Sequence, residues 1–146
     1  MSVFKTSRFF SESVDAVFQA FASPERLARW WGPDGFTNTF DVFEFKNGGS
    51  WRFTMHGPDG QHYPNVVVFE NIEINRLLVL SHVTQPAFKL TIQFEPNKES
   101  PSLGTTVTWQ QAFESADLAA SIQHIVEPAN EQNLSRWQKE LAQEAS

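Results

Sequence analysis

Between residues 36 and 113, apolar and polar side chains alternate along most of the chain, and this period of two constrains the fold most. In residues 88–94, Phe, Leu, Ile and Phe alternate with Lys, Thr and Gln, and residues 107–113 repeat the pattern with Val, Trp, Gln and Phe. Such alternation is typical of a β-strand with one buried face. We therefore expect a run of antiparallel strands in this region.

Short turn sequences separate these strands. Asn47-Gly48-Gly49 and Pro58-Asp59-Gly60 contain residues that tolerate positive φ and are typical of turns. Asn75-Arg76 forms a tight turn between two further apolar segments, 66–74 and 77–83. The spacing of these turns predicts short strands that follow one another directly.

A strand and two short helices are expected before the alternating region. Residues 3–10 are rich in β-branched and aromatic side chains and favour a first strand. Ser13 is a suitable N-cap, and the apolar residues after it have the spacing of one helix face. Ser23-Pro24-Glu25 combines a cap, a proline and an acidic residue, which together begin a helix that should end near Gly32-Pro33.

The residues after Ser115 are predicted to form a long C-terminal helix. The apolar stripe expected along it is Leu118, Ile122, Ile125, Ala129, Leu134, Trp137 and Leu141. Pro128 lies within this segment and is expected to kink or break the helix. The helix can cover the face of the sheet that would otherwise be wet, so the sequence predicts an α+β fold.

The composition excludes several kinds of chemistry. The chain has 146 residues and no cysteine, so disulfides, thiol catalysis and thiolate metal sites are excluded. Its four histidines are scattered, with His56 expected on an outer strand face and His62 in a turn, so neither a metal site nor a cofactor is expected. The length predicts one domain, residues 1–146.

Charge and hydropathy restrict the partners and the location. The net charge is −6, and from Glu95 onward there are eight acidic and three basic residues. No basic stripe is present, so neither nucleic acid nor an anionic membrane surface is an expected partner. No apolar run approaches the ~20 residues that cross a bilayer, and the N-terminus has no signal-peptide pattern, so a cytoplasmic location is expected.

Six short motifs, in a fixed order, carry a resemblance to a known superfamily: Ser23-Pro24-Glu25-Arg26-Leu27, Trp30-Trp31-Gly32-Pro33, Gly48-Gly49-Ser50-Trp51-Arg52, Pro58-Asp59-Gly60, Arg76-Leu77-Leu78 and Gly104-Thr105. The chain resembles the START-like, or Bet v-like (SRPBCC), superfamily over essentially its whole length. It is most similar to the branch related to the C-terminal domain of activators of the ninety-kilodalton heat-shock ATPase (AHSA-type), in an uncharacterised bacterial subgroup.

The resemblance implies a helix-grip fold. In that fold a curved antiparallel sheet of about six to seven strands wraps around the long C-terminal helix, and two short helices follow the first strand. The chain departs from many relatives at residues 129–134, where they have Gly-Trp, and at His82, where they have Trp. Roles within the superfamily include co-chaperone domains, aromatase/cyclases and carriers of hydrophobic ligands, so the fold alone does not determine the function.

A sheet that grips a helix usually leaves a mostly apolar cavity with a few directed polar groups. The polar residues expected at this cavity are Tyr63, His82, Gln111, Asn130 and Asn133. The aromatic residues expected to line it are Trp31, Phe36, Trp51, Phe53, Phe88 and Trp109. Two interpretations of the polar residues stay open. They contact a ligand, or they satisfy one another and the backbone, including carbonyl groups freed by Pro128.

Three functions are compatible with these features. The leading hypothesis is a module that binds a small hydrophobic or aromatic molecule, with a homodimer left open. The second is an enzyme of the cyclase or dehydratase kind, in which His82 is the general acid/base and Tyr63 or Gln111 polarises a carbonyl. The third, an interaction domain for a chaperone ATPase, follows from the resemblance only and is not favoured, because full activators carry a further N-terminal domain.

Overall fold

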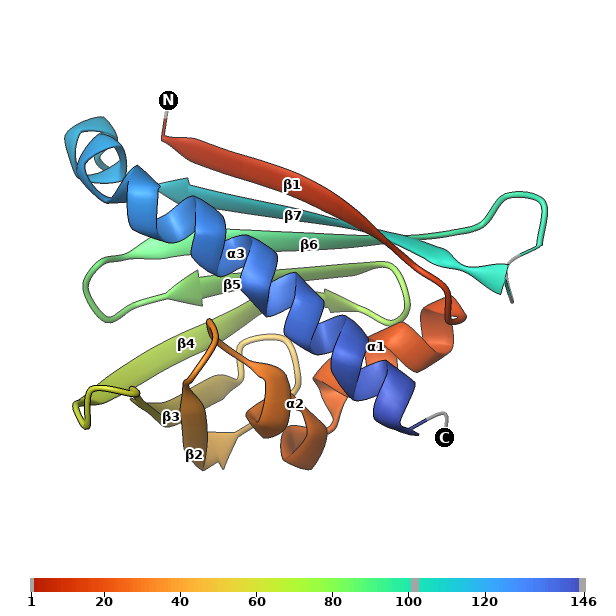
Figure 1. Ribbon diagram of the computed structural model, residues 1–146, viewed down its shortest axis with the longest axis horizontal. Coiled ribbons are helices and arrows are strands. Elements are labelled where there is room, and N and C mark those ends of the chain that lie inside the picture. Colours follow the sequence, from red (N-terminus) through yellow and green to blue (C-terminus); the bar gives the residue numbers. More distant parts are fainter. Residues whose placement is uncertain (1, 101–102, 145–146) are drawn as a thin grey trace.

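The computed structural model describes residues 2–100 and 103–144 (Figure 1). The strands are β1 (Val3–Phe10), β2 (Thr37–Phe43), β3 (Ser50–His56), β4 (His62–Glu73), β5 (Leu77–His82), β6 (Phe88–Pro96) and β7 (Thr105–Phe113). The helices are α1 (Val14–Ala22), α2 (Pro24–Trp30) and α3 (Ala116–Glu144). The predicted order of one strand, two short helices, a run of strands and a long helix is confirmed.

The seven strands form one antiparallel sheet in the order β1-β7-β6-β5-β4-β3-β2. Sheet neighbours are also chain neighbours, except that β1 pairs with β7. The register shifts between Phe40 and Val42 and between Phe69 and Asn71, and such irregularities bend a strand and increase its twist. Figure 1 shows α3 running across one face of the curved sheet, which is the expected helix-grip arrangement.

The two short helices begin where the sequence predicts. The Ser13 hydroxyl accepts a hydrogen bond from the Ala16 amide at the start of α1, and α2 begins with Pro24. Both helices lie beside the C-terminal half of α3 (Figure 1). The indole nitrogen of Trp30 at the end of α2 donates to the Ala20 carbonyl at 2.9 Å, which ties the two helices together.

An aromatic cluster fills this end of the molecule. Trp30 stacks on Trp137 of α3, with ring centres 4.5 Å apart and planes at 10°. Phe21 meets both of these rings and Trp51 of β3 at 5.8–6.1 Å. All four side chains are buried, and each favourable ring pair adds about 0.5–1.5 kcal/mol to the stability gained from burial. This cluster is therefore the structural centre of the fold.

The long helix confirms the predicted kink and corrects one part of the predicted stripe. α3 is continuous through Pro128, although its first turns point in a different direction from the rest, so the helix bends and does not break (Figure 1). Ile125 is 60% exposed and is not part of the buried stripe. Leu134, Trp137 and Leu141 are buried as predicted. Counting back from Trp137 at 3.6 residues per turn gives positions 133, 130 and 126, so the stripe before Leu134 is one residue out of phase with the prediction. The in-phase positions include Asn130 and Asn133.

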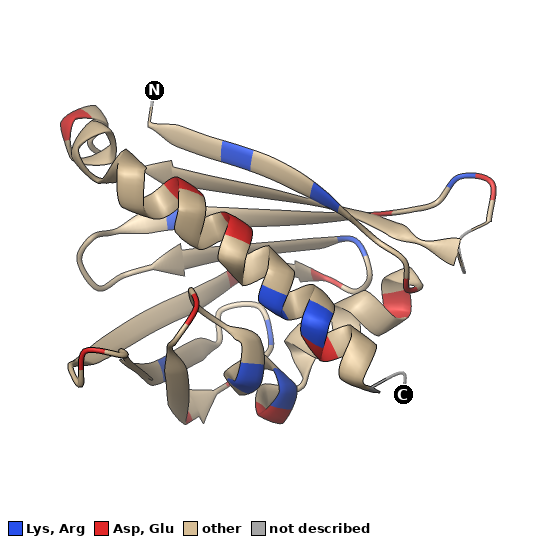
Figure 2. Ribbon diagram, viewed as in Figure 1, with Lys and Arg blue, Asp and Glu red and all other residues tan. Residues whose placement is uncertain are grey.

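Charged residues are dispersed along the chain, and the basic residues of α3 lie in its C-terminal half (Figure 2). No helix among the described residues has the length and apolar character needed to cross a membrane.

Candidate functional site

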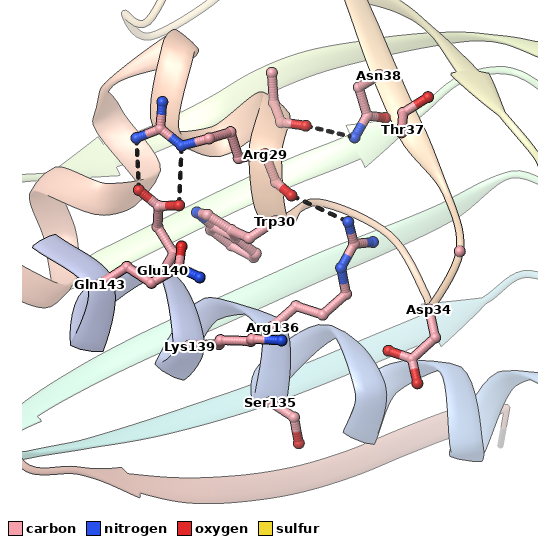
Figure 3. Close-up of a pocket in the computed structure, with 12 residues that line it drawn as sticks. Arg29, Trp30, Asp34, Thr37, Asn38, Ser135, Arg136, Lys139, Glu140 and Gln143 are labelled. Carbon is pink, nitrogen blue, oxygen red and sulfur yellow. Dashed lines mark hydrogen bonds and ion pairs between the residues drawn. The ribbon is translucent and has the colours of Figure 1, made fainter.

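Two pockets bear on function: a large surface hollow, whose side chains hold the fold together, and a smaller, partly open cavity. The hollow measures about 870 Å³ and lies between α2, the start of β2 and the second half of α3 (Figure 3). Within it, the Arg29 guanidinium donates to both oxygens of Glu140 at 3.0 and 2.7 Å. This hydrogen bonding lowers the pKa of the buried Glu140 carboxyl. The pair joins α2 to α3.

Arg136 has a similar structural role in the hollow. Its guanidinium donates at 2.7–3.3 Å to the carbonyl oxygens of Arg29, Trp31, Gly32, Pro33 and Phe36. Burial lowers the pKa of this guanidinium. These contacts fix the loop that follows α2, so the Arg136 guanidinium has a structural role.

The smaller cavity has a volume of about 200 Å³, is partly open to solvent, and lies between the sheet, the loop after α2 and α3. Trp31 and Gly32 form one side of its wall. Gly32 has a φ of 97°, which favours glycine, and it turns the chain sharply away from α2. The Gly32 amide donates to the side-chain oxygen of Asn133 at 3.3 Å, so α3 holds this part of the wall.

Most of the predicted site residues line this cavity. They are Trp31, Phe53, His82, Phe88, Trp109, Gln111, Asn130 and Asn133. Sequence reasoning missed Gly32, Pro33, Met55, Asn65, Pro86, Leu90 and Ala129. The alternation on β3 and β6 contains the signal for Met55 and Leu90. The others come from loops, strand ends and the helix phase, for which the local pattern gives no clear signal.

Three predicted positions, Trp51, Tyr63 and Phe36, lie outside the wall of this cavity. Trp51 is fully buried in the aromatic cluster and stacks on Phe53 with ring centres 4.3 Å apart. Tyr63 is 43% exposed, and its hydroxyl donates to the Asp59 carboxylate at 3.0 Å, which raises the pKa of Tyr63. Phe36 packs beside Tyr63, with ring centres 6.0 Å apart. Strand alternation identified the inner face but not the position along it.

His82 faces the cavity but is held by the protein. Its ring stacks on Phe88 with centres 4.5 Å apart, Nε2 lies 2.6 Å from Oδ1 of Asn65, and Nδ1 lies 3.0 Å from the Pro86 carbonyl. Burial lowers the pKa of His82. Both nitrogens lie within hydrogen-bond distance of protein oxygens, so neither is free to face a substrate atom. This geometry disfavours His82 as a general base.

The amide side chains bridge the sheet and α3. Asn130 donates from Nδ2 to Oε1 of Gln111 at 3.0 Å. Asn133 accepts from the Gly32 amide and makes a long contact, 3.4 Å, with the Trp30 carbonyl. Neither asparagine bonds a carbonyl of the preceding helical turn in the described chain, so they do not compensate for Pro128.

Two histidines that the sequence separates lie together on the sheet. His56 and His62 are register partners on β3 and β4, and their Nδ1 atoms are 2.7 Å apart. Nε2 of His56 also contacts the Thr39 hydroxyl at 2.7 Å. His62 is therefore the first residue of a strand and not part of a turn. In the residues that the structure describes, no three His, Cys, Asp or Glu side chains are grouped to hold a metal ion.

A curved sheet covered by a long helix, with a cavity between them, is the arrangement of a helix-grip protein of the SRPBCC class. Residues 12–145 match the sequence model of the family described as "Activator of Hsp90 ATPase homolog 1-like protein". The match covers most of the chain, which therefore belongs to this family. Proteins of this fold commonly bind hydrophobic ligands. A search of curated proteins finds no match.

Several solved bacterial structures share the fold. A protein from Arthrobacter aurescens, solved by NMR, is 24% identical with a TM-score of 0.87, over 97% of this chain and 86% of that one. A crystal structure from Nitrosomonas europaea is 18% identical with a TM-score of 0.87, over 98% and 96%. An AHSA1 protein from Silicibacter pomeroyi is 19% identical with a TM-score of 0.75, over 97% and 99%. At these identities the likeness shows the fold alone.

Proposed function

We propose that this protein binds a small, uncharged, apolar or aromatic molecule in the cavity between the sheet and α3. The observation that carries the proposal is a void of about 200 Å³ behind a wall of Trp31, Phe53, Phe88 and Trp109. An apolar cavity of about 150 Å³ is large enough for benzene, so this one suits one ring with a substituent. The location that we propose is the cytoplasm. The proposal is compatible with both a monomer and a homodimer.

The wall also argues for a neutral ligand. Among the described residues that line the cavity, His82 is the only one with a side chain that titrates near neutral pH, and burial favours its uncharged form. A buried charge without a partner is costly. A carboxylate or an ammonium group would therefore leave its charge uncompensated here.

The two other functions receive less support. An enzyme would need His82 to reach a substrate atom, but Asn65 and Pro86 face both ring nitrogens. The chaperone role follows from the family's name, and no surface of the described chain favours it over ligand binding.

The test is to fill the cavity. Ala129 lines it from α3, and Ala120 on the same helix is exposed. Toluene and phenol would be titrated into the wild type, Ala129→Phe and the control Ala120→Phe by calorimetry. We expect binding to the wild type and to the control, and at least a tenfold loss for Ala129→Phe, with circular dichroism confirming that each protein folds. Equal binding by all three proteins, or binding by none, would contradict the proposal.

A further inference from the structure

We propose that Gln111 and Asn130 recognise a ligand group that both donates and accepts a hydrogen bond, as a phenol or a primary carboxamide does. The inference rests on the proposed function and defines the polar group of the ring-sized ligand.

The two amides form a pair inside the cavity wall. Gln111 and Asn130 are 8% and 9% exposed, and both line the cavity. Their only hydrogen bond among the described side chains joins Nδ2 of Asn130 to Oε1 of Gln111 at 3.0 Å. This bond leaves the Gln111 NH₂ group and the Asn130 carbonyl oxygen without a protein partner. The pair thus presents donors and an acceptor side by side.

The result does not depend on how the two amides are oriented. If both side chains are turned over, Gln111 becomes the donor and Asn130 the acceptor in the bond between them. One NH₂ group and one carbonyl oxygen are still left over. Neither leftover group is among the fully buried atoms without a partner, so water reaches both, and a ligand that replaces this water with matched hydrogen bonds gains affinity over one that makes none.

Two other polar side chains at the wall already have hydrogen-bond partners within the protein. His82 is engaged with Asn65, and Asn133 with the Gly32 amide. Trp109 lies two residues before Gln111 on the same face of β7, and its buried indole N–H has no partner in the described part of the chain. Because the free Gln111 NH₂ group donates, the ligand's polar group should include an oxygen.

The experiment compares four probes that differ at one substituent: phenol, benzamide, toluene and benzoate. Each would be titrated calorimetrically into the wild type, the double variant Gln111→Met with Asn130→Leu, and the control Gln110→Met, which alternates to the other face of β7. In the wild type and control we expect phenol and benzamide to bind about tenfold more tightly than toluene, and benzoate to bind most weakly. In the double variant this preference should fall to about one.

The outcomes separate this inference from the proposed function. If toluene binds and phenol and benzamide bind no more tightly, the cavity is a ligand site but the amide pair does not select its polar group. If no probe binds the wild type, the proposed function fails first. If the double variant keeps the tenfold preference while circular dichroism shows a native fold, the inference is overturned.

Discussion

The two ends of the interface between α3 and the sheet are built differently. At the C-terminal end Leu134, Trp137 and Leu141 of α3 are buried within the hydrophobic core. At the other end, the in-phase positions of α3 hold Asn130 and Asn133, and a cavity lies between helix and sheet. The sheet has large aromatic side chains at both ends, so the difference between a filled end and an end with a cavity comes from the residues of α3.

The contrast explains how one scaffold serves both stability and binding. Rings that meet at 4.5–6 Å leave no room for a ligand, and they hold α1, α2 and α3 together. Small and polar residues on the same helix leave a void, and the amides that border it keep hydrogen-bonding capacity. Loss of contacts should therefore cost most at the aromatic end.

The largest effect is expected for Trp137→Ala. Trp137 is fully buried, stacks on Trp30 and donates from its indole nitrogen to the Val17 carbonyl at 3.2 Å. Its truncation should lower the free energy of unfolding by about 3–5 kcal/mol, measured by urea denaturation. Phe88→Ala, the matched change at the cavity end, should cost less, because Phe88 is only partly buried and already borders a void. Equal losses would remove the distinction between the ends.

A smaller effect is expected for Arg136→Met, which keeps most of the side-chain length. The variant leaves five backbone carbonyls of the loop after α2 without their donor. We expect a loss of about 2–3 kcal/mol in the free energy of unfolding, since hydrogen bonds to charged groups are among the stronger ones.

The control for this prediction is Lys139→Met in the same surface hollow. Lys139 makes no hydrogen bond or ion pair to any described residue. Its replacement should change the stability by less than about 0.5 kcal/mol. If the two variants lose the same amount of unfolding free energy, the effect comes only from removing a positive charge, and Arg136 does not organise the loop.

The elements follow from local sequence patterns, but the cavity does not. Alternation and turn residues give each strand, since side-chain direction in a strand repeats every two residues. The phase of the first half of α3 does not follow from an apolar stripe, because the polar residues Asn130 and Asn133 occupy its inner positions. The partners of His82 come from β4 and from the loop before β6, and only the folded register brings them together.

The smallest effect concerns pH and acts at the cavity end. Burial lowers the pKa of His82 below its ordinary value of 6.5, so the unfolded chain binds this proton more readily than the folded one. The contribution of neutral His82 to stability is therefore complete above pH 6.5 and is lost as the pH falls below that value. His82→Gln removes the titration and should flatten the decrease in unfolding free energy as the pH falls below 6.5. Urea denaturation at several pH values measures both slopes. If they are the same, the carbonyl acceptors at both nitrogens stabilise imidazolium enough to offset desolvation, and the cavity can hold a positive charge.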